Sequence, residues 1–352
     1  MTEQDPETKR VAGTIPPFRP ARWLPGRHLQ TVWGRTFRRG PKVDLRRETW
    51  ETPDDDDLTL DWLDGPPESP LLLTLHGLEG SSQSLYLHGL LHLAQARRWR
   101  GVALNFRSCA RPPGRPRREW VMNRGQRLYH SGETDDLDWI VHRLADREPD
   151  LRLALAGVSL GGNVLLKWLG ERGEDVPVAV RAAATISVPY DLAAASRHLQ
   201  FGLGPVYTRY FLKNLKEKAL RYAERYPGVV DVERVQRART FWEVDDAAVA
   251  PIHGFADAAD YYARSSSIDF VERIRVPTLL ISAADDPFLP AAVLPEVRRR
   301  MAESVSCEFT AKGGHTGFVT GPPWAPSPWA EERAIAFLAE HVEARSQQAA
   351  AP

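Results

Sequence analysis

The stretch that most constrains this chain is residues 151–163, LRLALAGVSLGGN, in which an apolar run leads into a serine flanked by glycines. The run predicts a buried strand, and the residues after the stretch predict a helix. Between them, GVSLG has the G-x-S-x-G spacing of a nucleophile elbow, a sharp strand-to-helix turn that exposes a serine hydroxyl. Side chains two positions before and after that serine would collide in so tight a bend, and Gly157 and Gly161 have none. Ser159 is therefore the candidate nucleophile.

Around this elbow, apolar runs alternate with helical segments, both before it and after residue 275. The runs are continuous, which is typical of strands covered on both faces. This alternation predicts an α/β fold, a mostly parallel sheet with helices on both sides. Besides the elbow strand, we expect strands at 43–51, 58–63, 71–75, 101–106, 180–188, 276–282 and 305–310. We expect helices at 84–97, 133–147, 291–301 and 330–344.

The pattern changes between residues 189 and 270, where we predict helices rich in aromatic residues and no strand. The helices are expected at 206–226 and 232–244, and the whole segment is interpreted as a helical cap inserted into the core. The predicted divisions are an N-terminal arm packed on the core (1–42), the core itself (43–188 and 271–345), the cap (189–270) and a disordered tail (346–352).

A nucleophilic serine needs a base to accept its proton and a carboxylate to orient that base. In this kind of fold, the order along the chain is serine, then acid, then histidine. Asp285 and Asp286 follow one predicted strand, and His315 follows the next. Because the carboxyl ends of parallel strands meet at one edge of the sheet, we expect these side chains near Ser159. Asp285 and Asp286 also suit an ordinary turn or helix cap. Either aspartate could be the acid, so the two remain alternatives.

A second element of the site is predicted in the loop after the strand at 71–75, which begins with His76-Gly77-Leu78. An oxyanion hole needs one amide from the residue after the nucleophile and one from such a loop. We expect the amides of Leu160 and Leu78 to form it, with Gly77 as the alternative to Leu78. We interpret His76 as orienting this loop rather than as a base.

Taken together, these motifs resemble the AB-hydrolase-4 family of α/β hydrolases, which includes the YheT-like esterases. The resemblance covers roughly residues 20–340. It rests on WLPGRHLQT (23–31), HGLEGSS (76–82), NFRSC (105–109), YHSGETDDL (129–137), GVSLGGN (157–163), PYDL (189–192), HGF (253–255), DDPF (285–288) and GGHTGF (313–318).

The resemblance implies an α/β-hydrolase fold and hydrolysis of carboxylic esters, with Ser159 as nucleophile and His315 as base. In the general hydrolase pattern the acid lies four residues before a proline, so Pro290 selects Asp286 over Asp285. One departure is the run DDDD at 54–57, where we expect a glycine between the acids; we interpret this run as a solvated turn. The aromatic cap favours short- to medium-chain or lipid-like esters. Alternatives are cleavage of thioesters or amides, or a binding module without catalysis.

Several other residues could carry chemistry. Cys109 is interpreted as a buried free thiol, because no base motif accompanies it. His88 and His92 are spaced by one helical turn but lack the glutamate of a zinc motif, so no metal site is expected there. Tyr129 and His130 are expected either to line the site or to brace its loop, and we favour bracing.

Composition narrows the remaining possibilities. The formal net charge is zero, which argues against nucleic-acid binding. Two cysteines and a polar start favour a cytoplasmic protein. The chemistry requires no cofactor or metal, and the expected partner is a small ester. Residues 97–127 contain ten arginines and a single acid, Glu119. This segment is interpreted as a solvated loop, with peripheral contact to an anionic membrane or lipid as the alternative.

Overall fold

The centre of the fold is an eight-stranded sheet, seen in a computed structural model that describes residues 15–343 apart from 39, 42 and 113–118. The strand order is β1-β2-β4-β3-β5-β6-β7-β8. β2 runs antiparallel to β1 and β4, and the other neighbours are parallel. The prediction of a mostly parallel sheet is confirmed. The strands are β1 (Arg46–Glu51), β2 (Asp57–Leu63), β3 (Leu71–Leu75), β4 (Arg100–Asn105), β5 (Leu153–Val158), β6 (Val180–Ile186), β7 (Thr278–Ala283) and β8 (Val305–Thr310).

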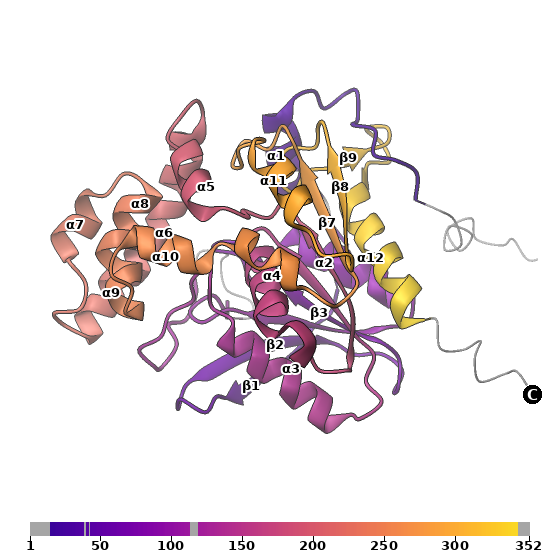
Figure 1. Ribbon diagram of the computed structural model, residues 1–352, viewed down its shortest axis with the longest axis horizontal. Helices are drawn as coiled ribbons and strands as arrows, with labels where there is room; N and C mark the ends of the chain where they lie inside the picture. The colour runs from indigo at the N-terminus through magenta and orange to yellow at the C-terminus, as the bar shows by residue number, and fades with distance from the viewer. Residues whose placement is uncertain (1–14, 39, 42, 113–118, 344–352) are drawn as a thin grey trace, which may run out of the picture.

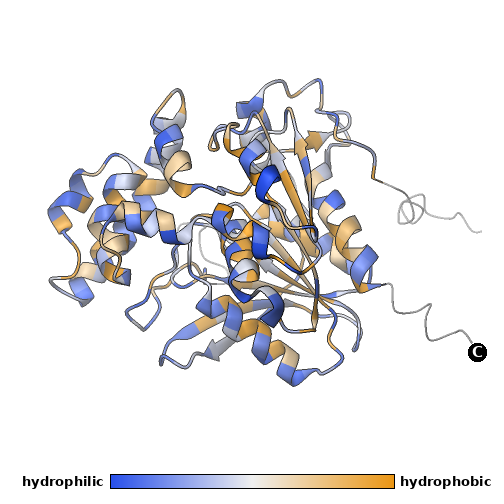
Figure 2. Ribbon diagram, in the orientation of Figure 1, coloured by the Kyte–Doolittle hydropathy of each residue, from blue (hydrophilic) through white to orange (hydrophobic). Residues whose placement is uncertain are grey.

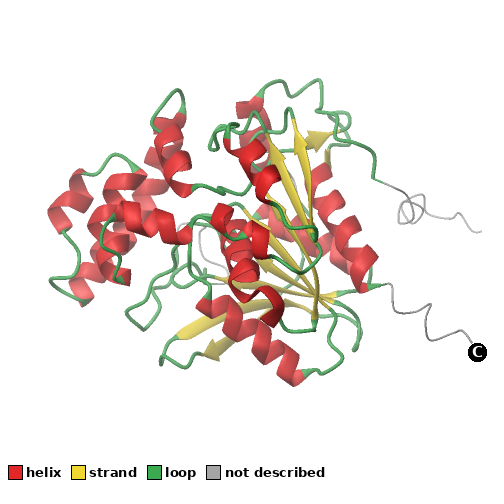
Figure 3. Cartoon of the chain, viewed as in Figure 1, coloured by secondary structure: helices red, strands yellow, loops and turns green. Residues whose placement is uncertain are grey.

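Helices cover both faces of this sheet, as Figures 1 and 3 show. Successive side chains of β3 point to opposite faces, so Leu71 and Leu73 enter one apolar cluster and Leu72 enters another. The first cluster also includes residues of α3 (Asp135–Arg147), α4 (Leu160–Arg172) and α11 (Val293–Arg300). The second includes residues of α2 (Leu85–Ala96) and α12 (Trp329–Val342). The central strands are apolar throughout because both of their faces are buried.

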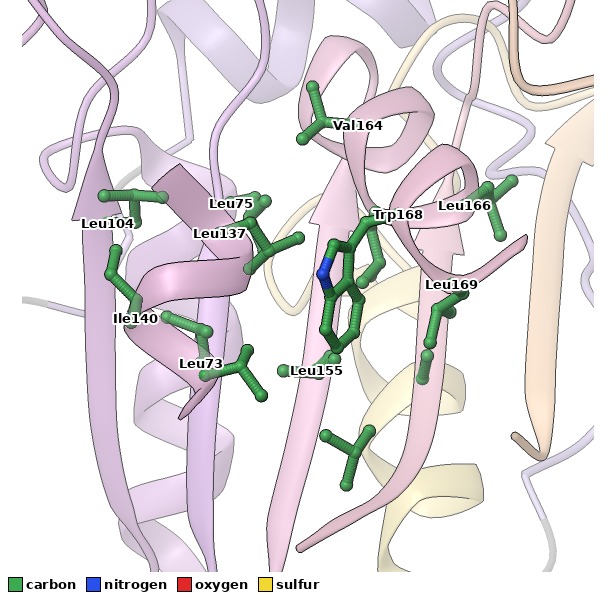
Figure 4. Packing of buried hydrophobic residues seen from close by; sticks show 14 of the residues in the cluster. Leu73, Leu75, Leu104, Leu137, Ile140, Leu155, Val164, Leu166, Trp168 and Leu169 are labelled. Carbon is green, nitrogen blue, oxygen red and sulfur yellow. The ribbon is translucent and has the colours of Figure 1, made fainter. Parts of the chain in front are cut away.

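Figure 4 shows the first cluster from close by, where Leu137 and Ile140 of α3 and Trp168 of α4 pack over the strands. Leu73 of β3 pairs in register with Leu155 of β5. Both leucines are fully buried. This packing fixes the direction in which β5 leaves the sheet and α4 begins.

The segment between β6 and β7 contains helices and no strand, and all of its residues are described. Figure 1 shows these helices on the opposite side of the molecule from α12, and we call residues 189–270 the cap. Figure 2 shows that hydrophobic residues run along the core strands but alternate with polar ones in the cap helices. The helices are α5 (Leu192–His198), α6 (Gly204–Arg225), α7 (Val232–Arg237), α8 (Phe241–Val244), the π-helical turn η3 (Asp245–Val249), α9 (Ala250–His253) and α10 (Ala258–Ser265).

The prediction of a single helix at 232–244 is wrong, because the structure has two helices there, α7 and α8. Thr240 forms a capping box with Glu243, in which the threonine hydroxyl accepts the glutamate amide and the glutamate carboxylate accepts the threonine amide. A capping box starts a new helix because it satisfies amides that have no partner within the helix. The chain therefore turns at residues 238–240.

The described part of the N-terminal arm packs on the core. Its helix α1 (Arg27–Thr36) lies beside the loop after β8, where the carboxamide of Gln30 accepts the amide of Val319 at 2.8 Å. Ala21 and Leu24 form a small apolar cluster with Val319. The tail predicted to be disordered lies outside the described residues. The remaining short elements are η2 (Gly173–Asp175), η4 (Ser267–Asp269), η5 (Val271–Arg273), β9 (Val319–Thr320) and β10 (Ser327–Pro328). Within the described residues, no helix has both the length and the apolar character needed to cross a membrane.

Candidate active site

Ser159 sits in a strained turn between β5 and α4. Its φ of 54° and ψ of −121° fall in a region that residues with a β-carbon rarely adopt. The bend brings backbone so close that a β-carbon on Gly157 would lie 2.6 Å from the carbonyl oxygen of Gly161. One on Gly161 would lie 2.5 Å from the carbonyl oxygen of His76. The two glycines are therefore required by the close approach of backbone on both sides of Ser159.

His315 lies in the glycine-rich loop after β8 and faces Ser159. Its Nε2 is 3.0 Å from Oγ of Ser159, and its Nδ1 is 2.8 Å from Oδ2 of Asp286. When Nδ1–H donates to the carboxylate, Nε2 carries the lone pair that can accept the serine proton. The loop is anchored to the arm, because the amide of His315 donates to the hydroxyl of Thr31 at 2.9 Å.

The two aspartates after β7 have different partners. Asp286 is 1% exposed, and its second oxygen accepts the amide of Phe288 at 2.8 Å, which leaves Oδ2 directed at His315. Asp285 instead accepts the amide of Gly314 at 2.9 Å and shapes the loop. The structure thus brings Asp286 to the histidine and places Asp285 on the backbone beside it.

The candidate oxyanion donors lie on either side of Ser159. The amides of Leu78 and Leu160 donate to no acceptor among the described residues, so both are available to a ligand. The amide of Gly77 is occupied, since it donates to the hydroxyl of Tyr86 at 2.9 Å. A β-carbon on Gly77 would lie 3.1 Å from Cβ of Ser159, which shows how closely this loop approaches the serine. This geometry favours Leu78 over Gly77.

His76 is fully buried behind the oxyanion loop. Its Nε2 accepts the amide of Phe106 at 3.2 Å, so Nδ1 carries the proton and donates to the carbonyl of Gly77 at 2.8 Å. Burial lowers the pKa of His76 to about 3, which keeps the ring neutral. With both nitrogens engaged, this histidine has no free position from which to act as a base.

Rings from the cap and arm continue from the histidine outward. Phe288 packs on His315 with ring centroids 4.3 Å apart, and Tyr207 of α6 packs on Phe288 at 4.8 Å. The hydroxyl of Tyr207 lies 3.0 Å from Nδ1 of His28 on α1. Leu78 and Phe288 both pack against the apolar cluster of the cap. Sequence reasoning did not identify these rings individually, because only the folded chain shows that Tyr207 and His28 meet.

We expected the acidic run at 54–57 to be a solvated turn. The structure differs, because two of its carboxylates bind a buried arginine. The fully buried Asp56 and the partly exposed Asp54 both bind Arg107, which is 1% exposed, at 2.7 and 2.8 Å. Asp136 of α3 binds the same guanidinium at 2.7 Å. The resemblance led us to expect a glycine within this run, and Asp55 has a φ of 58°, a conformation that favours glycine. The run therefore anchors a buried arginine.

The other candidates have structural surroundings. Cys109 is buried, and burial raises the pKa of its thiol to about 11, so it is not a thiolate nucleophile. His88 accepts the amide of Val43, and no group of metal-ligating side chains is present among the described residues. Tyr129 donates to the carboxylate of Glu79 at 2.6 Å, which is the bracing contact that was expected.

Five of the described arginines in residues 97–127 are paired with carboxylates. Ion pairs join them to carboxylates of other elements: Arg97 to Glu343, Arg100 to Glu148, Arg107 to Asp136, Arg124 to Asp57 and Arg127 to Glu133. These contacts reduce the charge that the segment offers to an anionic surface. Arginines 115, 117 and 118 lie outside the described residues.

Comparison with known proteins places the chain in a family. The sequence model of the alpha/beta hydrolase fold matches residues 70–322. The chain belongs to the α/β-hydrolase family, as its motifs predicted. It is 40% identical to the Escherichia coli protein named "Putative esterase YheT", over 94% of this chain and 95% of that one. It is 30% identical to the mouse phospholipase ABHD3, over 84% of this chain and 74% of that one.

Among solved structures, the esterase Pf2001 of Pyrococcus furiosus superposes with a TM-score of 0.53. The match covers 85% of this chain and 94% of that one at 16% sequence identity. At so low an identity the likeness concerns the fold alone. It agrees with the α/β fold described above.

Proposed function

We propose that this chain hydrolyses carboxylic esters through an acyl-enzyme formed on Ser159. The observation that carries the proposal is the hydrogen-bonded series from Asp286 through His315 to Ser159, with contacts of 2.8 and 3.0 Å. These are the three groups, in the chain order, by which α/β hydrolases transfer acyl groups. Relatives named as an esterase and a phospholipase support ester hydrolysis in general.

In the proposed first step, Nε2 of His315 takes the proton of Ser159 as Oγ attacks the ester carbonyl carbon. The carbonyl oxygen becomes an oxyanion that accepts hydrogen bonds from the amides of Leu78 and Leu160. Asp286 stabilises the imidazolium and holds its orientation. His315 then gives the proton to the leaving alkoxide, so that an alcohol departs and the acyl group remains on Ser159.

The second half-reaction repeats these steps with water. His315 takes a proton from water, whose oxygen attacks the acyl carbon, and the same amides hold the second oxyanion. The serine oxygen leaves and regains its proton from His315, and a carboxylic acid is released. Each step uses side chains and amides of this chain, so the proposal includes no cofactor or metal.

We further propose that the cap selects short- to medium-chain or lipid-like acyl groups. The support is the apolar wall that Leu78, Phe211 and Phe288 form with the cap cluster next to His315. Such a wall favours an apolar acyl chain because burying each methylene stabilises the complex by about 0.8 kcal/mol. Polar or charged acyl groups would lose their hydration there without a partner.

The decisive experiment compares wild type with Ser159→Ala on a chromogenic ester. Loss of the nucleophile is expected to reduce kcat by about 10⁶, as removal of a triad serine does elsewhere. A fluorophosphonate probe is expected to label wild type and not the variant. Ser306→Ala changes an exposed serine of β8 and is the control that should keep both signals. Hydrolysis retained by Ser159→Ala would overturn the assignment.

A substrate panel separates the alternatives on the same residues. Matched oxygen esters, thioesters and amides of one acyl chain are compared by kcat/KM, and the oxygen esters are expected to be cleaved fastest. A thioester preference would reassign the enzyme as a thioesterase. Absence of both turnover and fluorophosphonate labelling would favour a binding module.

A further inference from the structure

A buried ion pair joins the cap to the oxyanion loop. Lys218, in the middle of α6, places its Nζ 2.7 Å from Oε1 of Glu79. The two side chains are only 4% and 3% exposed, so neither charge is compensated by water. Glu79 directly follows Leu78, whose amide is a candidate oxyanion donor. Glu79 is thus one residue from a proposed oxyanion donor, and its partner Lys218 belongs to the cap.

The groups around Lys218 stabilise its positive charge. Its Nζ lies 3.3 Å from Sγ of Cys109. It lies 5.2 Å from the ring centroid of Trp120 and 5.0 Å from that of Tyr129. Ring faces attract a cation at such distances. Although burial acts to lower it, Cys109 and Glu79 raise the pKa of Lys218, so the ammonium form persists.

Glu79 is held on both its side chain and its backbone. The hydroxyl of Tyr129 donates to Oε1 at 2.6 Å and accepts the Glu79 amide at 3.1 Å. Arg111 donates to the Glu79 carbonyl at 3.3 Å. Glu79 also has a φ of 54°, a conformation that a residue with a β-carbon keeps only when its surroundings enforce it. This constrained conformation lies directly after Leu78 and limits how that residue can move in the oxyanion loop.

We propose that Lys218, acting through Glu79, is a positioning residue that holds the amide of Leu78 toward the oxyanion. The inference rests on the proposed function, since it assigns a support to that same hole. It makes the cap part of the catalytic apparatus: α6 must be docked for the oxyanion loop to take its active shape. A ligand that displaces α6 would therefore reduce turnover as well as binding.

The test uses three variants of the full chain: Lys218→Met, Glu79→Gln and the double substitution. With a short soluble ester, each is expected to lower kcat by about 10- to 100-fold and to leave KM within about twofold. Affinity for a trifluoromethyl ketone, which forms an oxyanion on the serine, is expected to fall by a similar factor. Loss of one whole oxyanion donor costs about 10²–10³ in kcat, so a misplaced donor should cost less.

The double variant separates positioning from stability. Each single variant leaves a buried charge alone and is expected to lower Tm, whereas the double variant removes both charges and should recover much of that loss. Its kcat should stay low, because the support is still absent. Arg100→Met is the control, since Arg100 binds Glu148 at the amino end of β4, on the opposite edge of the sheet from Ser159. It should lower Tm and keep kcat within about twofold.

Two results would overturn the proposal. One is recovery of kcat together with Tm in the double variant, which would make the pair a purely structural contact. The other is unchanged ketone affinity in Glu79→Gln, which keeps the side-chain volume and remains informative if Lys218→Met fails to fold. A failure of the proposed function itself would appear elsewhere, as hydrolysis retained by Ser159→Ala.

Discussion

The core and the cap contribute to the candidate site in different ways. The core supplies Ser159, Asp286 and His315, each in the loop or turn that follows the carboxyl end of a strand. The cap supplies no reacting group; its rings and Lys218 reach the site through Phe288 and Glu79. In the proposed mechanism, the core therefore supplies the reacting groups, and the cap selects the acyl group and supports the oxyanion loop.

Buried carboxylates make the same contrast. In the core, Asp286 is buried with His315 as its partner, and Asp56 is buried with Arg107. In the cap, Asp245 is 9% exposed and has no cationic partner among the described residues; its Oδ2 faces the hydroxyl of Tyr262 at 2.5 Å. A buried charge without a cationic partner lowers the free energy of unfolding. The charged form of Asp245 therefore destabilises the cap, whereas Asp286 and Asp56 have partners in the core.

The largest effect that tests this contrast concerns the acid of the core. Asp286→Asn keeps the shape but removes the charge that stabilises the imidazolium, and it favours the wrong tautomer of His315. We expect kcat to fall by about 10⁴, the size of this substitution in a serine-protease triad. Asp285→Asn should change kcat by less than about tenfold, because Asp285 binds the amide of Gly314 and not the ring. Steady-state kinetics on one chromogenic ester measures both.

Equal losses in the two variants would contradict the assignment of separate roles. The thermal midpoint of each variant is the control, since both aspartates hold backbone amides of the loops around them. A large fall in kcat with an unchanged midpoint in Asp286→Asn alone would sharpen the distinction between the two neighbours.

A smaller effect is expected from the cap wall. Phe211 of α6 packs 6.0 Å from Phe288 and 6.2 Å from Phe241, measured between ring centroids, and it touches no reacting group. Phe211→Ala removes apolar contact with a long acyl chain, worth about 1–2 kcal/mol. We therefore expect kcat/KM to fall about tenfold for a medium-chain ester and to stay within about twofold for an acetyl ester. The measurement is an acyl-chain-length series.

Val206→Ala is the matched control for that series, because Val206 lies on the same helix and is 66% exposed. Its chain-length profile should coincide with that of wild type. A uniform loss over all chain lengths in Phe211→Ala would instead mean that the cap acts on the chemistry and not on acyl selection.

The core was easier to predict from sequence than the cap for a physical reason. The elbow encodes its own sterics, since the two glycines and the serine lie within five residues. The places of Asp286 and His315 follow from strand ends, which apolar runs mark clearly. The meeting of Tyr207 with Phe288 depends on how α6 docks, and no local pattern contains that information. The break before α8 was signalled locally by Thr240 and Glu243, and the helical periodicity across it was misleading.

The smallest expected effect on catalysis comes from a test of how Asp245 affects the stability of the cap. Burial raises the pKa of Asp245 to about 7, although the hydrogen bond from Tyr262 favours the charged form. The unfolded value is about 3.9, so between pH 4 and 7 the native state binds more protons than the unfolded chain. The stability contributed by the protonated carboxyl is fully present below pH 4 and is lost as pH rises through 7. The free energy of unfolding is thus expected to decline by about 4 kcal/mol over this interval because of Asp245 alone.

Asp245→Asn keeps an acceptor for Tyr262 and cannot ionise. Its Tm should match that of wild type near pH 4 and exceed it by several degrees at pH 8, with kcat at pH 8 within about twofold. Thermal unfolding followed across this pH range checks the slope, and Asp246→Asn is the control, since Asp246 is paired with Arg234 at the surface. If the two unfolding profiles stayed parallel from pH 4 to 8, Asp245 would not be the group that loses its proton on unfolding. The cap would then resemble the core, with its buried carboxylate charged and stabilised by the hydroxyl of Tyr262.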